Sequence, residues 1–254
     1  MQQVYMRQLI IGEGRPKICV PVTGEKEEDI LIEMKKTTEL PADLIEWRGD
    51  WYEDIFDPEK RKSLLLKIRA VIGETPLLFT YRSLQEGGQR AASPEVYKQL
   101  NEDICASGLV DAVDVELFMG DKFIKPIIDA AHKAGIPVIG SNHDFFKTPD
   151  KDEIVRRLIL MEEAGADVLK IAVMPQNEAD VLELLSATEE MRRLYTDRPL
   201  IMISMAKLGL ISRIAGETFG SAITFGAGET GSAPGQMDAV RLEKVLDWIH
   251  ESMA

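Results

Sequence analysis

One lysine of this sequence stands inside an apolar segment. Lys170 lies in the run Ala166–Val173, whose other members are mostly Val, Leu, Ile and Ala. An isolated buried ammonium group is costly, so a lysine in such a place must be either paired or neutral. A neutral amine is a nucleophile toward ketones. Lys170 is therefore a candidate for Schiff-base chemistry, and a strand-end lysine that reaches solvent is the alternative.

A histidine follows a second apolar run. His143 comes two residues after the segment Pro137–Ser141. Its imidazole titrates near neutral pH and suits proton transfer, and a hydrogen-bonded structural histidine is the alternative. His132 and His250 lie in helical patterns and are expected to face solvent. No set of His, Cys or carboxylate residues has a spacing typical of a metal site.

Three arginines follow or lie near other apolar runs, namely Arg48, Arg82 and Arg213. A guanidinium group matches a carboxylate through two parallel hydrogen bonds, although a single arginine in such a place is more often part of a salt bridge. Together, in a strongly acidic chain, the three favour a small anionic ligand. The glycine-rich segment Gly226–Gln236 could hold a phosphate or form a mobile lid, and Glu229 within it weighs against phosphate.

The elements that must position these residues are eight short apolar runs, which recur about every 29 residues with helical patterns between them. Such a period over about 250 residues is typical of a (β/α)8 TIM barrel, an α/β fold whose active site forms at the C-terminal ends of the strands. A doubly wound sheet is the alternative, but the sequence has no dinucleotide fingerprint. The predicted strands are Ile18–Val22, Asp43–Trp47, Leu77–Tyr81, Ala112–Leu117, Pro137–Ser141, Val168–Val173, Leu200–Ser204 and Ala222–Phe225.

The chain ends and helix boundaries add detail. The segment Val4–Ile11, a turn at Gly12–Gly14 and the run from Ile18 predict an extra N-terminal β-hairpin that caps the barrel floor. Ser93 and Pro94 predict the start of a helix. No linker is apparent, so residues 1–254 are expected to form a single barrel domain.

Composition excludes several classes of function. The chain has 254 residues, 45% of them hydrophobic and 29% charged, with a formal net charge of −13. A protein this acidic repels nucleic acid and anionic membranes, so neither is expected as a partner. No apolar stretch approaches the ~20 residues of a membrane span, and the N-terminus does not look like a secretory signal. Two distant cysteines, Cys19 and Cys105, fit a reduced cytoplasmic protein.

The polar and apolar segments form a recognisable set: Ile45–Arg48, Phe79–Ser83, Glu86–Gly88, Asp114–Glu116, Ser141–Asp144, Lys170–Gln176, Ile203–Met205, Ile211–Arg213 and Ser232–Gln236. In combination, these segments closely resemble the type I 3-dehydroquinate dehydratase (3-dehydroquinase) family. Each segment alone is a weak signal, but together they follow one another in order over nearly the whole chain. The sequence departs from the family at Ile203, where Met is common, and at Gly228–Gly231, where many relatives carry a lysine.

The resemblance implies a homodimeric hydro-lyase of the shikimate pathway that converts 3-dehydroquinate to 3-dehydroshikimate without a metal or organic cofactor. Lys170 matches the family's imine-forming lysine, His143 its proton-transfer histidine and Glu86 the carboxylate that orients this histidine. Arg213 matches the residue that grips the substrate carboxylate. The residues that match those holding the ring hydroxyls and closing the lid are Glu46, Arg48, Arg82, Ser232 and Gln236.

Two other functions stay open at this point. A class I aldolase would use the same barrel and the same lysine, but would usually handle a sugar phosphate. A non-catalytic barrel could bind small acids, although Lys170 and His143 on adjacent strands are hard to explain in a pure binder.

Overall fold

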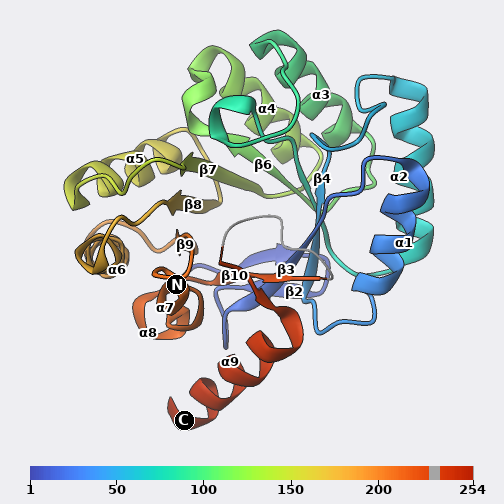
Figure 1. Cartoon of the computed structure of the whole chain (residues 1–254). Helices are drawn as coiled ribbons and strands as arrows, with labels where there is room; N and C mark the ends of the chain where they lie inside the picture. Colours follow the sequence, from blue (N-terminus) through green and yellow to red (C-terminus); the bar gives the residue numbers. More distant parts are fainter. Residues whose placement is uncertain (229–234, 254) are drawn as a thin grey trace.

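The computed structural model describes residues 1–228 and 235–253, and in these ranges eight parallel strands curl into a barrel with helices around it (Figure 1). The sheet order runs from β10 through β3 to β9, and β9 and β10 meet again through a parallel bridge between Leu200 and Ser221. The barrel strands are β3 (Lys17–Val22), β4 (Leu44–Arg48), β5 (Leu77–Thr80), β6 (Ala112–Glu116), β7 (Val138–Asp144), β8 (Val168–Val173), β9 (Leu200–Ser204) and β10 (Ile223–Ala227).

The predicted (β/α)8 TIM barrel is thus confirmed, and the eight strands lie where the apolar runs predicted them. The largest difference is β7, which continues three residues beyond the expected end at Ser141. His143 therefore belongs to the strand itself. Two residues of β11 (Met237–Asp238) extend the sheet by pairing with the end of β10.

Helices connect successive strands and cover the outside of the barrel (Figure 1). Ser93 caps α3 by accepting a hydrogen bond from the backbone N–H of Val96, with Pro94 at the first helical position as predicted. No helix within the described ranges is long and apolar enough to cross a membrane. The helical segments are α1 (Glu27–Thr37), α2 (Pro58–Ile72), η1 (Leu84–Glu86), α3 (Pro94–Ala106), η2 (Leu117–Met119), α4 (Asp121–Lys133), α5 (Lys151–Glu163), α6 (Glu178–Leu194), α7 (Leu210–Ile214), α8 (Gly216–Phe219) and α9 (Ala239–Met253).

The N-terminal hairpin is present, but its turn is not where the sequence predicted it. Strands β1 (Val4–Met6) and β2 (Leu9–Ile11) pair antiparallel, with Met6 opposite Leu9, so the turn is formed by Arg7 and Gln8. Arg7 takes the positive φ of 56° that a two-residue hairpin turn requires. A turn does begin at Gly12, where the sequence predicted one, but it leads from β2 toward β3 and does not connect the two strands of the hairpin. Glycine therefore marked a real turn, whereas the hairpin's own turn contains none.

The barrel interior is divided into an apolar lower layer and a polar upper layer. Side chains alternate along a strand, so residues two apart share a face. The lower layer includes Leu44, Leu78 and Val168, and it packs against Val4 and Met6 of the hairpin, which closes the floor. On β4 to β8 the next inward positions, two residues further along each strand, are buried and polar: Glu46, Thr80, Asp114, Ser141 and Lys170.

Candidate active site

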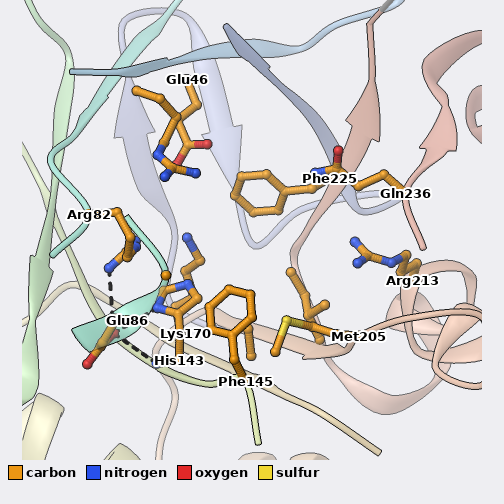
Figure 2. A pocket seen from close by; sticks show the side chains of 14 residues that line it. Glu46, Arg82, Glu86, His143, Phe145, Lys170, Met205, Arg213, Phe225 and Gln236 are labelled. Carbon is orange, nitrogen blue, oxygen red and sulfur yellow. Dashed lines mark hydrogen bonds and ion pairs between the residues drawn. The ribbon is translucent and has the colours of Figure 1, made fainter. Parts of the chain in front are cut away.

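A pocket opens above the polar layer, at the C-terminal ends of the strands (Figure 2). It contains about 620 Å³ of space, part of it open to solvent. Every predicted site residue lines it except Ser232, which lies outside the described residues, as does the stretch 229–234 of the predicted lid. The lining residues are Glu46, Arg48, Arg82, Glu86, Gly87, His143, Phe145, Lys170, Ala172, Ile203, Met205, Arg213, Phe225 and Gln236.

Lys170 is buried at the centre of this arrangement. Its side chain projects from β8 and is only 4% exposed, with Nζ 3.2 Å from Oδ2 of Asp114. The ring of Phe225 lies on another side, 4.7 Å from Nζ to the centroid. A lysine that reaches bulk solvent is therefore excluded. The amine is held by one carboxylate and one aromatic face inside the pocket.

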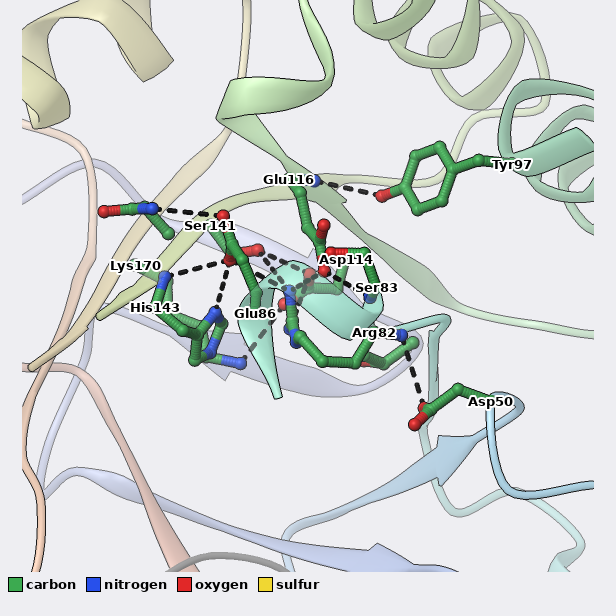
Figure 3. Close-up of polar contacts among 12 residues, drawn as sticks. Asp50, Arg82, Ser83, Glu86, Tyr97, Asp114, Glu116, Ser141, His143 and Lys170 are labelled. Atoms are coloured by element: carbon green, nitrogen blue, oxygen red, sulfur yellow. Dashed lines mark hydrogen bonds and ion pairs between the residues drawn. The ribbon is translucent and has the colours of Figure 1, made fainter. Parts of the chain in front are cut away.

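Asp114 connects this lysine to an arginine (Figure 3). Its second oxygen, Oδ1, accepts hydrogen bonds from Nη2 of Arg82 at 2.8 Å and from Oγ of Ser141 at 2.6 Å. Burial acts to raise the pKa of Asp114, but the charges of Arg82 and Lys170 outweigh it and leave the pKa below its ordinary value. Asp114 is thus an ionised carboxylate shared by two cations.

His143 forms a hydrogen-bonded pair with Glu86. Its Nδ1 lies 2.9 Å from Oε2 of Glu86, and its backbone N–H donates to the same oxygen at 2.9 Å. Burial, and after it the positive charges of Arg82, Lys170 and Arg48, hold the pKa of His143 well below its ordinary value. The imidazole is therefore neutral, and a carboxylate partner at Nδ1 favours the tautomer with the proton on Nδ1. This leaves Nε2 as the basic nitrogen.

Glu86 reaches this pair from η1, and opposing influences set its charge. Burial and the neighbouring Glu116 raise its pKa to about 8, although Arg82 and a hydrogen bond from Asn142 act to lower it. Three N–H groups lie at its two oxygens, two from His143 and one from Nδ2 of Asn142 at 3.0 Å. Such a set of donors favours the ionised form, which only accepts hydrogen bonds, and so limits the rise in pKa.

The three arginines differ in what they contact. Arg82 donates to Glu116 at 2.9 Å as well as to Asp114, so it joins two carboxylates that lie behind the pocket lining. Arg48 forms a two-fold hydrogen bond with the fully buried Asp50, at 2.7 Å for both contacts. Arg213 comes from α7, and burial lowers its pKa to about 10. An anionic ligand beside Arg213 would offset this desolvation.

The remaining walls divide into a polar and an apolar part. Glu46 accepts a hydrogen bond of 2.7 Å from the Thr80 hydroxyl. Arg213 and Gln236 lie across the pocket from His143 and Glu86 (Figure 2). The apolar wall consists of Phe145, Ala172, Ile203, Met205 and Phe225.

Several polar residues lie behind the pocket lining, and sequence reasoning assigned no role to them. Asp114, Glu116, Ser141 and Asp50 bind the arginines and the lysine, but none was placed in the site. The alternation of Asp114 and Glu116 on one face of a strand was the available signal. Among the described residues, no group of three or more His, Cys, Asp or Glu could hold a metal ion.

Comparison with known proteins decides the family. The family model described as Type I 3-dehydroquinase matches residues 18–253. The chain belongs to the type I 3-dehydroquinase family. A curated 3-dehydroquinate dehydratase of Clostridioides difficile (strain 630) is 51% identical over 99% of both chains, and one of Listeria welshimeri is 50% identical over 99% of both. The protein is accordingly a hydro-lyase that dehydrates 3-dehydroquinate.

Solved structures of dehydratases share the fold. The enzyme from Clostridium difficile, solved with covalently modified comenic acid, gives a TM-score of 0.97 at 51% identity and 99% coverage of both chains. The enzyme from Geobacillus kaustophilus gives 0.96 at 38% identity, covering 100% of this chain and 98% of that one. A 3-hexulose-6-phosphate synthase with a TM-score of 0.61 at 17% identity shares the fold alone.

Proposed function

We propose that this dehydratase forms an imine between Lys170 and the ketone of 3-dehydroquinate, and that His143 moves the protons of the elimination. The observation that carries the proposal is a buried amine and a neutral imidazole that line one pocket. A pure binding protein would have no need of this pair. The covalent ligand of the Clostridium difficile relative supports covalent capture of a small acid.

The first step requires a neutral amine. The ammonium of Lys170, held by Asp114, gives its proton to His143 or to water, and the free amine adds to the ketone carbon. The carbinolamine hydroxyl then takes up that proton and leaves as water, which leaves a protonated imine and a neutral His143. The positive imine nitrogen forms within reach of the Asp114 carboxylate, which stabilises its charge.

The second step is a proton transfer followed by loss of water. The cationic imine withdraws electrons and acidifies the neighbouring carbon, from which Nε2 of His143 takes a proton to give an enamine. The enamine electrons then expel the β-hydroxyl, which leaves as water with the proton from His143. Glu86 stabilises the intermediate imidazolium through Nδ1, as the carboxylate of a catalytic triad does. Hydrolysis of the product imine restores Lys170.

The substrate is held by its carboxylate and its hydroxyls. Arg213 is the proposed carboxylate ligand, because its charge is buried and lies across the pocket from His143 (Figure 2). A carboxylate bound there would leave the ring between Arg213 and Lys170. The residues proposed to hold ring hydroxyls and close the site are Glu46, Arg48, Arg82, Ser232 and Gln236.

Formation of the conjugated enone from 3-dehydroquinate, followed by ultraviolet absorbance, tests this function. The parent protein and Lys147→Ala, which changes a lysine outside the pocket lining, should both produce the enone, whereas Lys170→Ala should not. Turnover by Lys170→Ala at the parent rate would contradict the imine mechanism. Retained binding of 3-dehydroquinate without turnover in the parent would favour the non-catalytic alternative.

Four broader properties extend the proposal. We propose that residues 1–254 form one barrel domain, that the protein is a cytoplasmic homodimer and that it acts in the shikimate pathway of aromatic amino-acid biosynthesis. The family resemblance supports all four. The molar mass in solution, measured by light scattering against the 28.4 kDa of one chain, tests the dimer.

A further inference from the structure

A buried asparagine on β7 joins the catalytic pair to the helical layer. Asn142 lies between Ser141 and His143, and its side chain points to the other face of the strand. It is 3% exposed. Its Nδ2 donates to Oε1 of Glu86 at 3.0 Å, and its Oδ1 accepts from Nη1 of Arg157 at 2.8 Å. Both ends of the amide are therefore engaged.

Arg157 is itself fixed at three points. It lies on α5, where its Nε donates to Oε1 of Glu153 at 2.7 Å, one helical turn earlier. Its guanidinium carbon lies 5.3 Å from the ring centroid of Phe118 in η2. Its side chain is 14% exposed. A guanidinium with an ion pair, an aromatic face and an amide contact has little freedom to move.

The chemistry of this contact dictates which way the Asn142 amide faces. Arginine can only donate hydrogen bonds, so the amide oxygen must point toward Arg157. The amide nitrogen then points toward Glu86. The reverse orientation would set two donors against each other and an amide oxygen against a carboxylate oxygen. Arg157 thereby determines that Glu86 receives an N–H donor at Oε1.

We propose that Asn142 and Arg157 are positioning residues for the dehydration, which act by holding Glu86 in place for His143. The inference rests on the proposed function, in which Glu86 supports the charged form of His143. With Oε1 held by Asn142, the other oxygen of Glu86 is directed at Nδ1 and the backbone N–H of His143. Neither positioning residue lines the pocket, so both act through Glu86.

The charged groups around the pair determine the expected pH effect. Glu116 and Asp114 act on Glu86 from β6, Arg82 acts on it from the end of β5, and Lys170 and Arg48 act on His143 from β8 and β4. Only the Asn142 donor depends on Arg157. Without that donor the pKa of Glu86 rises, so Glu86 gains a proton at a higher pH and no longer supports the imidazolium.

A pair of adjacent arginines provides a matched test. Arg156 and Arg157 both bind Glu153, but only Arg157 contacts Asn142. Arg157→Met should lower kcat, leave KM nearly unchanged and shift the acidic limb of the kcat–pH profile to higher pH. Arg156→Met should match the parent, and Arg157→Lys, which can still donate to the amide oxygen, should recover part of the loss.

Asn142→Ala tests the same series of contacts at the residue that touches Glu86. It removes a hydrogen bond to a charged group, so kcat should fall at least about tenfold, with the same pH shift. The double variant Asn142→Ala with Arg157→Met should be no slower than Asn142→Ala alone, because Arg157 acts only through the amide. A product of two independent losses would contradict the proposal.

Imidazole nitrogen NMR gives a readout that separates positioning from general stability. The chain has three histidines, and His143→Ala assigns the signal of His143. In the parent and Arg156→Met this signal should report protonated Nδ1, whereas in Arg157→Met and Asn142→Ala it should report mixed tautomers. Borohydride trapping of substrate on Lys170 in each variant checks that the pocket is folded, and if Arg157→Met does not fold, Arg157→Leu, which also lacks a donor, replaces it.

Different results would contradict the positioning role of Asn142 and Arg157 and the proposed role of His143. Parent-like kcat, pH profile and His143 signal in both Arg157→Met and Asn142→Ala would overturn the positioning role while His143→Ala remained inactive. Parent-like turnover in His143→Ala would instead overturn the proposed function.

Discussion

At the scale of single residues, the site combines a lysine amine that is paired with a carboxylate and a histidine that is held neutral. Asp114 holds the Lys170 amine, whereas burial and three cations keep the His143 imidazole neutral. A neutral histidine can take a proton from carbon, and its bond to Glu86 stabilises the charge that results. Amine and imidazole thus serve different steps, which separate substitutions can distinguish.

Replacement of the histidine should separate imine formation from proton transfer. His143→Ala retains Lys170 and Asp114, so borohydride added with substrate should still yield an adduct. Its kcat should fall by at least about 10²–10⁴-fold, because the substitution removes the proposed general base and acid. Mass spectrometry of the adduct and the enone assay measure the two effects. A variant that is neither trapped nor active would place His143 in the first step as well.

Replacement of the buried arginine should act on substrate binding. Arg213→Ala removes the buried cation proposed to bind the substrate carboxylate, a loss of roughly 2–5 kcal/mol, and KM should rise accordingly. Arg213→Lys should recover only part, since an ammonium cannot reproduce the two-fold contact of a guanidinium. Steady-state kinetics of both variants measure this, and an unchanged KM in Arg213→Ala would refute the assignment.

At the scale of elements, the 3-10 turn η1 carries Glu86 and ends at a glycine that the pocket requires. Gly87 has a φ of 84°, and a Cβ there would come within 2.4 Å of the Phe145 ring, which lines the pocket. Side-chain size at this turn is therefore limited by the pocket wall as well as by the backbone. Gly108, with a φ of 66° and open space around it, provides a comparison.

The two glycines predict different outcomes for the same substitution. Gly87→Ala and Gly108→Ala should both lose about 1–2 kcal/mol of stability, because alanine is strained at positive φ. Only Gly87→Ala should also displace Phe145 and Glu86 and so lower kcat, by about tenfold or more. Thermal unfolding and the enone assay on both variants measure this. Equal kcat values in the two would show that η1 tolerates the displacement.

Sequence reasoning located the strands well because each apolar run is buried on both faces in a parallel barrel. The same alternation that buries Leu44 directs Glu46 inward, so the pocket residues at strand ends were predictable. The partners of those residues were not. Asn142 on β7 accepts a hydrogen bond from Arg157 on α5, fifteen residues later in the sequence. The hairpin turn at Arg7 contains no glycine. These features depend on tertiary packing, which no local pattern encodes.

At the scale of the whole molecule, burial of an uncharged histidine makes stability depend on pH. The pKa of His143 is lowered in the folded state, so below about 6.5 the unfolded chain binds a proton that the folded protein does not. The contribution of His143 to stability is therefore fully present above that pH and declines as pH falls toward the folded-state pKa. One such group accounts for about 1.4 kcal/mol between pH 7.5 and 5.5.

Removal of the titrating group should flatten this dependence. His143→Gln should lose less thermal stability than the parent between pH 7.5 and 5.5, by about 3 to 5 °C in Tm. Calorimetry of both proteins at the two pH values measures the difference. Parallel declines in Tm would mean that His143 is not held neutral in the folded protein.

The central claim is that Lys170, buried in the barrel and held by Asp114, bonds covalently to the substrate. Borohydride reduction in the presence of 3-dehydroquinate, followed by peptide mass spectrometry, tests it most directly. The account predicts loss of activity and added substrate mass on the peptide that contains Lys170, with neither effect in Lys170→Ala. Added mass on Lys147 or Lys207 instead, or full activity after reduction, would contradict it.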